Sequence, residues 1–496
     1  MRVHSSACHG VLTAALSIAS FSSLVSANPP KVAECLADAG VPQELPRSEE
    51  FKEDTEAFNA RLSFTPQAFA IPETVEHVQA AVVCGADNGI PVSARGGGHS
   101  YAAHGLGGEN SHLVLDMKNF DWVELDTETG IASVGPGALL GKVASELFDQ
   151  GERALSHGTC PTVGLGGHVL HGGYGLSSRT QGVTLDRMIE ATVVLANGQI
   201  VTASTEENSD LFWALRGAGS SFGIVTNIKF DTFEAPSVNT VFEYKYLNFT
   251  QEQARTAMGE LQSYANTTQP SEMNLRMFSN LDMTVFTGVY YGTVEEMGAE
   301  MAPFIEKIGT PANVTNSTVG WIESLLTYSN GPLDEPIPRE TFFAKSLMSK
   351  GYSDDALDTF VDYWYEEALN VNRDWFIIVD THGGPSSAIS RLPKESTSYP
   401  HRDAILKCQF YDRIWNHTYP ENGFDLMNHW VDSVTSFMDD GDYGMYFNYA
   451  DTSLTADEAH HMYWLENYPR LSDIKTNVDP LDLFTNPQAV RAKRAL

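Results

Sequence analysis

The sequence predicts an α+β fold in which an antiparallel sheet is covered by helices. Two regions of the chain, with different patterns of apolar residues, lead to this prediction. From about residue 65 to 235, short strand-like runs alternate with turns and few helices, whereas from about 237 to 440 pairs of alternating-apolar runs are separated by single long amphipathic segments. Strand pairs between single helices are typical of a mixed or antiparallel sheet with helices on one face.

The first part of the chain contains short strand candidates and one clear helix. The strands are the runs NGIPVSA, SHLVLDM and GIASVGPG, followed by ATVVLANGQIVTAS, which reads as a hairpin turning at Asn197-Gly198. The helix is PETVEHVQAAVVCGADNG, residues 72–89. Its apolar Val75, Val78 and Val82 recur on one face, and it should end near a glycine.

The second part carries longer elements. Helical periodicity runs through 251–265, 294–309, 355–369 and 424–438. Strand alternation runs through 273–280, 283–292, 374–383 and 405–414.

Composition and charge limit the partners. The 496 residues include 31 Lys and Arg against 64 Asp and Glu, so the net charge of −33 disfavours nucleic acid and anionic membranes and suits a neutral or cationic substrate. Residues 1–27 read as a signal peptide, and no later run of eighteen apolar residues follows. We therefore expect a secreted glycoprotein, with N-x-S/T sequons in stretches that include exposed loops, at Asn248, Asn266, Asn313, Asn316 and Asn416.

Loss of the signal peptide leaves four cysteines in a compartment that permits disulfides. Cys35 and Cys84 lie in two helix-like segments near the mature N-terminus, and we expect them to pair. Cys408 is then a buried thiol and Cys160 is left for chemistry. A Cys160–Cys408 disulfide is the alternative.

Two stretches are unusually rich in glycine: RGGGHSYAAHG, from Arg95 to Gly105, and HGTCPTVGLGGHVLHGGYG, from His157 to Gly175. Glycine lets the backbone approach a ligand closely, so the N–H groups of both loops could hold a diphosphate, to which Arg95 would add charge. Neither stretch matches a G-x-x-x-x-G-K-[ST] phosphate loop or a G-x-G-x-x-G dinucleotide site. Tight turns alone are the structural alternative.

The sequence also contains residues that resemble two other kinds of site. His157, Cys160, His168 and His171 contain potential zinc ligands, but their spacing matches no common zinc site, so we expect no metal. GSSFG, residues 219–223, fits the hydrolase pattern G-x-S-x-G, yet it follows a helix and precedes a strand, the reverse of the order that a nucleophile elbow requires.

Five long motifs carry a resemblance to a known family. RGGGHSYAAHGLGGENSHLVLDM, SHGTCPTVGLGGHVLHGGYG, SDLFWALRGAGSSFGIVT, YFNYAD and DPLDLFTNPQAV resemble the berberine bridge enzyme-like flavoproteins of the vanillyl-alcohol oxidase fold, most nearly the fungal glucooligosaccharide and chitooligosaccharide oxidases. The resemblance implies a two-part FAD-binding domain of the p-cresol methylhydroxylase type. Its parts would be residues 28–236 and a C-terminal return, 441–496, with an inserted substrate-binding domain at 237–440.

The resemblance also implies how FAD is held. His99 would bond to the flavin 8α-methyl group and Cys160 to ring carbon 6, so that the cofactor is attached bicovalently. Val163, three residues after that cysteine, would lie near the oxygen-reactive carbon and is typical of oxidases. The remaining cofactor-binding residues that we expect are Arg95, Gly96, Gly97, Gly98, Ser100, Gly164, Gly166, Gly167, Gly172, Gly173 and Ile224.

The same resemblance assigns the catalytic residues. Tyr449 would remove the hydroxyl proton, and Asp380 would assist it through a hydrogen bond to the phenol. Strand alternation in GMYFNYAD would place Tyr446 on the opposite face from Tyr449. The sugar would be bound by residues of the inserted domain and one of the first glycine stretch: Tyr101, Arg276, Phe376, Ile378 and Gln409.

The implied activity is oxidation of the anomeric hydroxyl of an oligosaccharide reducing end to a lactone, with O₂ reduced to hydrogen peroxide, by a monomeric enzyme. Phe376 and Ile378 depart from the glucooligosaccharide oxidase pattern, so the sugar stays open, and an aromatic or secondary-metabolite alcohol is the alternative substrate. A carbohydrate-binding relative without catalysis is a third class, which the retention of the candidate catalytic and flavin-linking residues argues against.

Overall fold

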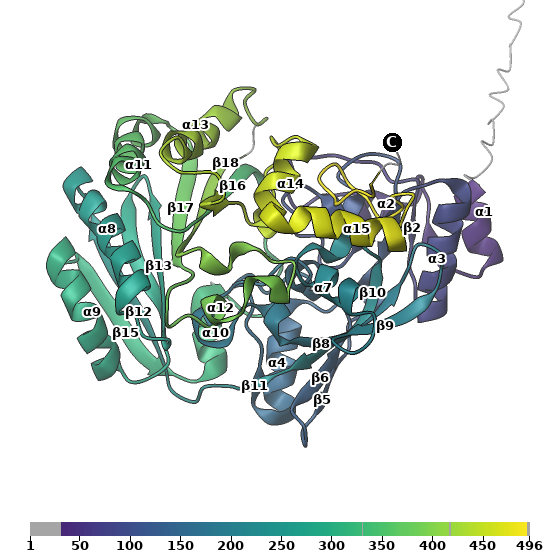
Figure 1. The fold of residues 1–496 in the computed structure, drawn as a ribbon, viewed down its shortest axis with the longest axis horizontal. Coiled ribbons are helices and arrows are strands. Elements are labelled where there is room, and N and C mark those ends of the chain that lie inside the picture. Colours follow the sequence, from purple (N-terminus) through teal and green to yellow (C-terminus); the bar gives the residue numbers. More distant parts are fainter. Residues whose placement is uncertain (1–30, 330, 416–417, 494–496) are drawn as a thin grey trace, which may run out of the picture.

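The computed structural model describes residues 31–329, 331–415 and 418–493 (Figure 1). The expected signal peptide and the sequon at Asn416 lie outside these residues. In Figure 1 a part built from the N-terminal half lies on one side, and a large sheet with its helices lies on the other. The C-terminal helices, drawn in yellow, return to the N-terminal half.

A small sheet opens the N-terminal half, with strand order β1-β2-β4-β3. β2 and β3 both run parallel to β4, whereas β1 is antiparallel to β2. Its strands and the helices beside it are α1 (Lys31–Asp38), β1 (Gln43–Glu44), α2 (Glu49–Asp54), β2 (Ala68–Ala70), α3 (Val75–Asn88), β3 (Val92–Arg95) and β4 (Leu113–Asp116).

The predicted helix at 72–89 is confirmed as α3. The hydroxyl of Thr74 caps it by accepting a hydrogen bond from the His77 N–H, at 3.2 Å. Val78 and Val82 are fully buried. Gly89 ends the helix with φ 62°, the left-handed conformation that favours glycine.

A second, antiparallel sheet follows, with strand order β5-β6-β10-β8-β9. The predicted hairpin at Asn197-Gly198 joins β8 to β9, and Gly198 has φ 79°. The elements here are β5 (Val123–Asp126), β6 (Ile131–Val134), α4 (Leu140–Gly151), β7 (Arg153–Ala154), α5 (Leu165–Val169), α6 (Ser178–Gln181), β8 (Met188–Val194), β9 (Ile200–Ser204), α7 (Ser209–Ala218), β10 (Ile224–Asp231) and β11 (Phe233–Glu234).

The large sheet is antiparallel throughout, with strand order β15-β12-β14-β13-β17-β18-β16-β19 among the described residues. All four strands predicted in this part are present, as β13, β14, β17 and β18. The strands are β12 (Asn239–Leu247), β13 (Met273–Asn280), β14 (Met283–Tyr290), β15 (Asn313–Val319), β16 (Thr341–Ser349), β17 (Asp374–Thr381), β18 (Leu406–Ile414) and β19 (Tyr443–Gly444).

Helices cover one face of the large sheet, on the side away from the N-terminal half of the chain (Figure 1). The covering helices match the four predicted ones: α8 (Gln251–Thr267), α9 (Val294–Ile308), α11 (Asp354–Glu366) and α13 (Gly423–Thr435). Shorter helices connect the parts of the fold: α10 (Trp321–Ser329), α12 (Ala388–Arg391), α14 (Ala456–Trp464) and α15 (Tyr468–Val478). The expected antiparallel sheet covered by helices is therefore confirmed.

The C-terminal return is anchored by a buried lysine. Lys475 of α15 donates hydrogen bonds to the carbonyls of Ser221, at 2.6 Å, and Phe484, at 2.8 Å. Its ammonium also forms an ion pair with Asp479 at 2.5 Å. This polar cluster is fully desolvated and closely paired, so it joins residues near 221 to the last segment of the chain.

The cysteine predictions are confirmed. Cys35 of α1 and Cys84 of α3 form a disulfide across 49 residues of sequence. Closing a loop of that length is worth about 4 kcal/mol in the chain-entropy treatment. Cys408 is a buried free thiol and Cys160 an exposed one, so the alternative Cys160–Cys408 disulfide is wrong.

The asparagines of the four described sequons, Asn248, Asn266, Asn313 and Asn316, are exposed. Asn266 ends helix α8, while Asn313 and Asn316 lie on β15, the edge strand of the large sheet.

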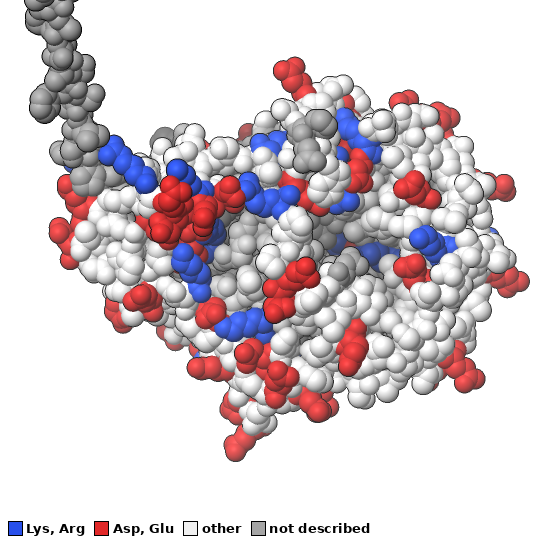
Figure 2. All heavy atoms as spheres, turned by 180° about the vertical axis from the view of Figure 1, so that it is seen from behind, with Lys and Arg blue, Asp and Glu red and all other residues white. Residues whose placement is uncertain are grey.

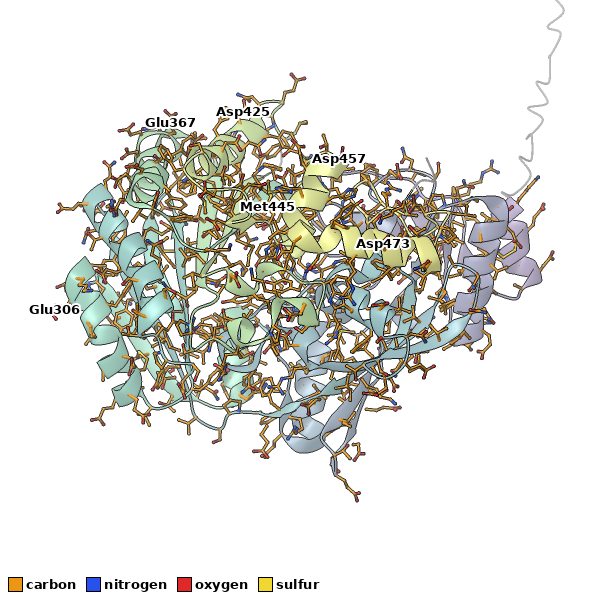
Figure 3. The ribbon with its side chains drawn as sticks, in the orientation of Figure 1. Glu306, Glu367, Asp425, Met445, Asp457 and Asp473 are labelled. Atoms are coloured by element: carbon orange, nitrogen blue, oxygen red, sulfur yellow. A yellow bond between two sulfur atoms is a disulfide. The ribbon has the colours of Figure 1, made fainter. Side chains whose placement is uncertain are left out.

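Acidic side chains are spread over the face seen in Figure 2, which is hollowed near its middle. The acidic residues labelled in Figure 3, such as Glu306 and Asp473, lie on the outer helices.

No helix in the described part of the chain is both long and apolar enough to cross a membrane.

Candidate active site

A cavity of about 910 Å³ lies between the glycine loops and the uncovered face of the large sheet. One wall contains most of the residues expected to bind the cofactor: Gly96, Gly97, Gly98, His99, Ser100, Cys160, Val163, Gly164, Gly166, Gly167 and Ile224. The facing wall contains all the residues expected to bind the sugar, together with the expected base: Tyr101, Arg276, Phe376, Ile378, Gln409 and Tyr449.

The two glycine loops pack backbone against backbone. A Cβ atom on Gly97 would overlap the backbone of Gly164, and a Cβ on Gly164 would overlap Gly97, so neither position accepts a side chain. At Gly167, by contrast, a Cβ would meet nothing within 4 Å. Glycine therefore allows the two loops to make close contact at Gly97 and Gly164. At Gly167 it leaves open space along the cavity.

His99 and Cys160 present reactive atoms to the same cavity. The Nε2 atom of His99 lies 2.8 Å from the Thr162 hydroxyl, and its ring stacks on Phe58 at 4.3 Å. Burial lowers the pKa of His99 to about 4, so the imidazole is neutral at pH 7. Because Nε2 is engaged, Nδ1 is the nitrogen left for a bond to a ligand. Cys160 carries a free, exposed thiol.

Three charged side chains form a buried chain beneath the facing wall. Asp380 of β17 accepts a hydrogen bond from Arg276 Nε at 2.6 Å and forms an ion pair with Lys407 Nζ, also at 2.6 Å. Burial opposes the charge of Asp380, but the two cations outweigh it and hold the pKa of its carboxyl below the ordinary value. The carboxylate is therefore ionised at neutral pH.

Lys407 connects this chain to Tyr449. Its ammonium lies 3.4 Å from the Tyr449 hydroxyl and 4.7 Å from the centre of that ring. Burial opposes its charge, but attraction to Asp380 and Tyr449 raises its pKa above the ordinary value. Lys407 is therefore a fixed cation beside the phenol oxygen. The Tyr449 ring also stacks on Tyr101 at 5.6 Å, which orients it in the cavity.

Comparison with known families and proteins assigns this site to a family. The FAD binding domain family matches residues 66–204, and the family described as berberine and berberine like matches residues 445–491. The chain is 44% identical to the xylooligosaccharide oxidase of Thermothelomyces thermophilus over 467 residues, covering 92% of this chain and 93% of that protein. The chain belongs to the berberine bridge enzyme-like family of FAD-linked oxidases.

Other similar proteins and solved structures are also described as oligosaccharide oxidases. The glucooligosaccharide oxidase of Sarocladium strictum is 41% identical, covering 97% of this chain and 98% of that protein. The structure of a xylooligosaccharide oxidase from Myceliophthora thermophila in complex with xylobiose has a TM-score of 0.91 at 43% identity, covering 94% of this chain and all of that one. A glucooligosaccharide oxidase structure from Acremonium strictum, with a TM-score of 0.90 at 40% identity and the same coverage, is described as having a 6-S-cysteinyl, 8α-N1-histidyl FAD.

Three of the residues expected to bind FAD have other partners in this berberine bridge enzyme-like chain. The Arg95 guanidinium is neutralised by ion pairs with Asp54 and Asp116 and does not line the cavity. Gly172 and Gly173 pack against Tyr446 instead: a Cβ on Gly172 would lie 2.7 Å from its ring, and the Gly173 N–H donates to its hydroxyl at 2.9 Å. These contacts leave the three residues outside the lining of the cavity, and their binding of FAD stays a prediction.

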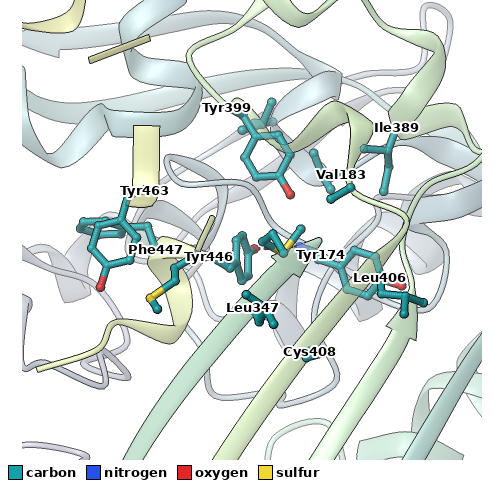
Figure 4. Close-up of a cluster of buried hydrophobic side chains, with 14 of the residues drawn as sticks. Tyr174, Val183, Leu347, Ile389, Tyr399, Leu406, Cys408, Tyr446, Phe447 and Tyr463 are labelled. Atoms are coloured by element: carbon teal, nitrogen blue, oxygen red, sulfur yellow. Dashed lines mark hydrogen bonds between the residues drawn. The ribbon is translucent and has the colours of Figure 1, made fainter. Parts of the chain in front are cut away.

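The segment around Tyr449 is not a strand. Phe447–Tyr449 form a 3₁₀ turn, so strand alternation was the wrong reason for separating the two tyrosines. The side chains of Tyr446 and Tyr449 nevertheless have different surroundings, as expected. The hydroxyl of Tyr446 accepts hydrogen bonds from the backbone N–H groups of Gly173 and Tyr174, at 2.9 and 3.2 Å, and its ring is buried in the core shown in Figure 4.

The expected hydrogen bond between Asp380 and Tyr449 is replaced by a chain through Lys407, which sequence reasoning missed. A signal was available, because Lys407 precedes Gln409 by two residues on an apolar strand and so shares its face. A lysine inside such a strand is rarely buried without a partner.

The wall beside the charged chain that ends at Tyr449 is apolar. Ile378 pairs directly with Gln409 on one side and with Phe278 on the other, and the rings of Phe278 and Phe376 stack at 5.5 Å. The placement of Gln409 on a strand next to Ile378 was predicted. Phe278 was missed, although it stands two residues after Arg276 on the same strand face.

The rival chemistries find no support in the geometry. Ser221 is buried, and its hydroxyl accepts a hydrogen bond from the Val490 N–H at 3.1 Å, so it holds the C-terminal segment. Among the described residues, no three His, Cys, Asp or Glu side chains lie close enough together to hold a metal ion.

Proposed function

We propose that this protein oxidises the anomeric C1 hydroxyl of oligosaccharide reducing ends to a lactone, which water opens to an aldonic acid, and reduces O₂ to hydrogen peroxide. The observation that carries the proposal is the chain from Arg276 through Asp380 and Lys407 to Tyr449, which ends in the cavity that His99 and Cys160 also face. The identity to oligosaccharide oxidases supports the choice of substrate.

His99 and Cys160 hold FAD in this proposal. The free Nδ1 atom of His99 and the exposed thiol of Cys160 suit two covalent attachments, and the open space at Gly167 leaves room along the glycine loop. When bound, FAD supplies the acceptor for the hydride that leaves C1.

Tyr449 removes the proton from the C1 hydroxyl. A phenol is a weak base unless its anion is stabilised. Lys407, at 3.4 Å, supplies a positive charge for the phenol oxygen, while Asp380 and Arg276 hold that ammonium in place. Asp380 is thus a positioning residue, which acts on the sugar through Lys407 and Tyr449.

Gln409 and Tyr101 orient the sugar. The side-chain amide of Gln409 donates a hydrogen bond to the Tyr101 hydroxyl at 3.0 Å, which leaves its carbonyl oxygen to accept one from a sugar hydroxyl. Phe376 and Ile378 offer apolar surface to the ring face, and Arg276 offers an N–H edge to ring oxygens.

Val163 lies at the cavity wall, and we assign it the place of the residue that leaves room for O₂. The protein acts as a secreted monomer after removal of residues 1–27. Its domains are divided at about residues 237 and 441, which separates the large sheet from both parts of the FAD-binding half.

An oxidase of another alcohol is the second candidate, favoured by the apolar surface of Phe278, Phe376 and Ile378. Peroxide release is the test, measured with cello-, xylo-, malto- and chito-oligosaccharides, lactose and aryl alcohols. Turnover of the oligosaccharides with formation of aldonic acids supports the proposal. Turnover of aryl alcohols alone selects the second candidate.

A further inference from the structure

The cavity extends beyond the catalytic chain toward the edge of the large sheet. Its lining includes side chains of β14, β12 and the edge strand β15, none of which the reacting end of a sugar needs. These strands continue the sheet past Arg276 of β13 in the order β14-β12-β15.

Four polar residues form one row across these strands. Arg276 pairs with Thr287, Thr287 with Glu243, and Glu243 with Thr315 in the antiparallel registers. Directly opposite residues point to the same face of a sheet, and all four line the cavity. Neighbouring strands are about 4.8 Å apart, so the row extends about 14 Å outward from Arg276.

Glu243 is the chemically distinctive member of this row. Its side chain is half-buried, and among the described residues none donates a hydrogen bond to its carboxylate or forms an ion pair with it. A carboxylate that loses part of its hydration without gaining a partner costs stability, unless a ligand supplies the donors. An ionised carboxylate only accepts hydrogen bonds, so the ligand must donate them.

A parallel row supplies apolar surface. Phe278 pairs with Val285 two residues along each strand from Arg276 and Thr287, and both side chains line the cavity. Polar and apolar rows side by side match a pyranose, which presents hydroxyls at its edge and C–H groups on its face. The distance between neighbouring strands, about 4.8 Å, is comparable with the length of one sugar unit.

We propose that Thr287, Glu243 and Thr315 form an outer subsite that binds hydroxyls of the second and later sugar units of a neutral oligosaccharide, with Glu243 and Thr315 beyond the second unit. The inference rests on the proposed function, because it takes the reducing end to lie at Tyr449. Glu243 is then a residue that determines chain-length preference. Binding at this distance from C1 changes affinity and leaves the chemical step alone, so its loss should act on KM.

The test compares a disaccharide with a tetrasaccharide of the best substrate series. In Glu243→Gln, the ratio of kcat/KM for the tetrasaccharide to that for the disaccharide should fall about tenfold, through KM, which is the size of one hydrogen bond to a charged group. Thr315→Val, on the neighbouring strand, should lower the same ratio by a smaller factor relative to Asn313→Gln, because both changes remove the N-x-T sequon at Asn313. Flavin absorbance and thermal unfolding report whether each variant is folded.

Glu295→Gln is the matched control, since Glu295 is an exposed carboxylate on α9, away from the row. The same ratio in the Glu243 and Glu295 variants would overturn the subsite, as would a wild-type protein that does not distinguish the two chain lengths. If the protein oxidises both disaccharides and tetrasaccharides but shows neither a lower ratio in Glu243→Gln nor a preference for chain length, the subsite is overturned and the proposed function stands. A protein that oxidises no oligosaccharide overturns both.

Discussion

Removal of the ammonium beside Tyr449 is the sharpest perturbation of the proposed proton transfer. In Lys407→Met the buried methylene chain is largely kept while the charge is lost. A unit charge 3.4 Å from the phenol oxygen is worth about 5 kcal/mol at an effective dielectric constant of about 20, and about 2.4 kcal/mol if entering water doubles that constant. The lower value alone predicts a loss on the order of a hundredfold in the rate of sugar oxidation.

The assay is anaerobic reduction of the bound flavin by sugar, followed by absorbance from pH 6 to 9. The raised pKa of Lys407 keeps the wild-type ammonium charged across this range, so the wild-type rate should vary little on its account. In Lys407→Met the rate should be low at neutral pH and recover as the pH rises, because hydroxide then takes over removal of the phenol proton.

Lys345→Met is the matched control. Lys345 is also a buried lysine of the large sheet, paired with Asp451 at 2.6 Å, but it does not contact Tyr449. Both variants leave a carboxylate with one cation fewer, so both should lower the unfolding temperature. Only Lys407→Met should change the pH profile. A wild-type rate in Lys407→Met, or an equal shift in both variants, refutes the role given to this charge.

Three further predictions concern the cavity wall. Tyr449→Phe should slow flavin reduction by about a hundredfold or more with the flavin still bound, the usual scale for losing a general base. Tyr446→Phe should instead lower thermal stability, and a reversed pattern would move the base to Tyr446. His99→Ala and Cys160→Ala should each retain FAD through acid precipitation, whereas the double variant should lose it; a colourless wild-type precipitate contradicts covalent attachment. Val163→Leu should slow reoxidation by air in stopped flow, and equal reoxidation rates would remove Val163 from the oxygen site.

Local patterns predicted the elements well, because hydrophobic periodicity reports which face of a helix or strand is buried. The alternation of β17 placed Phe376 and Ile378 together on the cavity wall, with Gln409 on the neighbouring strand. The disulfide followed from the two helix-like segments that carry Cys35 and Cys84.

Contacts between residues that lie far apart in the sequence could not be predicted from these local patterns. The glycine-rich context of Arg95 suggested a phosphate, but long-range folding brings Asp54 and Asp116 to its guanidinium. Asp380 was expected to form a hydrogen bond with Tyr449, yet Lys407 stands between them, because Lys407 pairs with Asp380 in the register of β17 and β18. Alternation along β18 places Lys407 on the face of Gln409, but the register that brings Lys407 opposite Asp380 depends on how the two strands pair across the sheet.

The anchoring of the C-terminal return has a consequence for biosynthesis. The contact between Gly173 and Tyr446 joins residues 273 positions apart in the chain, and the bond from Lys475 to the Ser221 carbonyl spans 254 positions. A chain is made from its N-terminus at about 5–20 residues per second, so the segment that carries Tyr449 leaves the ribosome among the last. If Tyr449 is the base, as we propose, a nascent chain has the proposed cofactor wall long before it has this residue, and turnover cannot begin until synthesis is nearly complete.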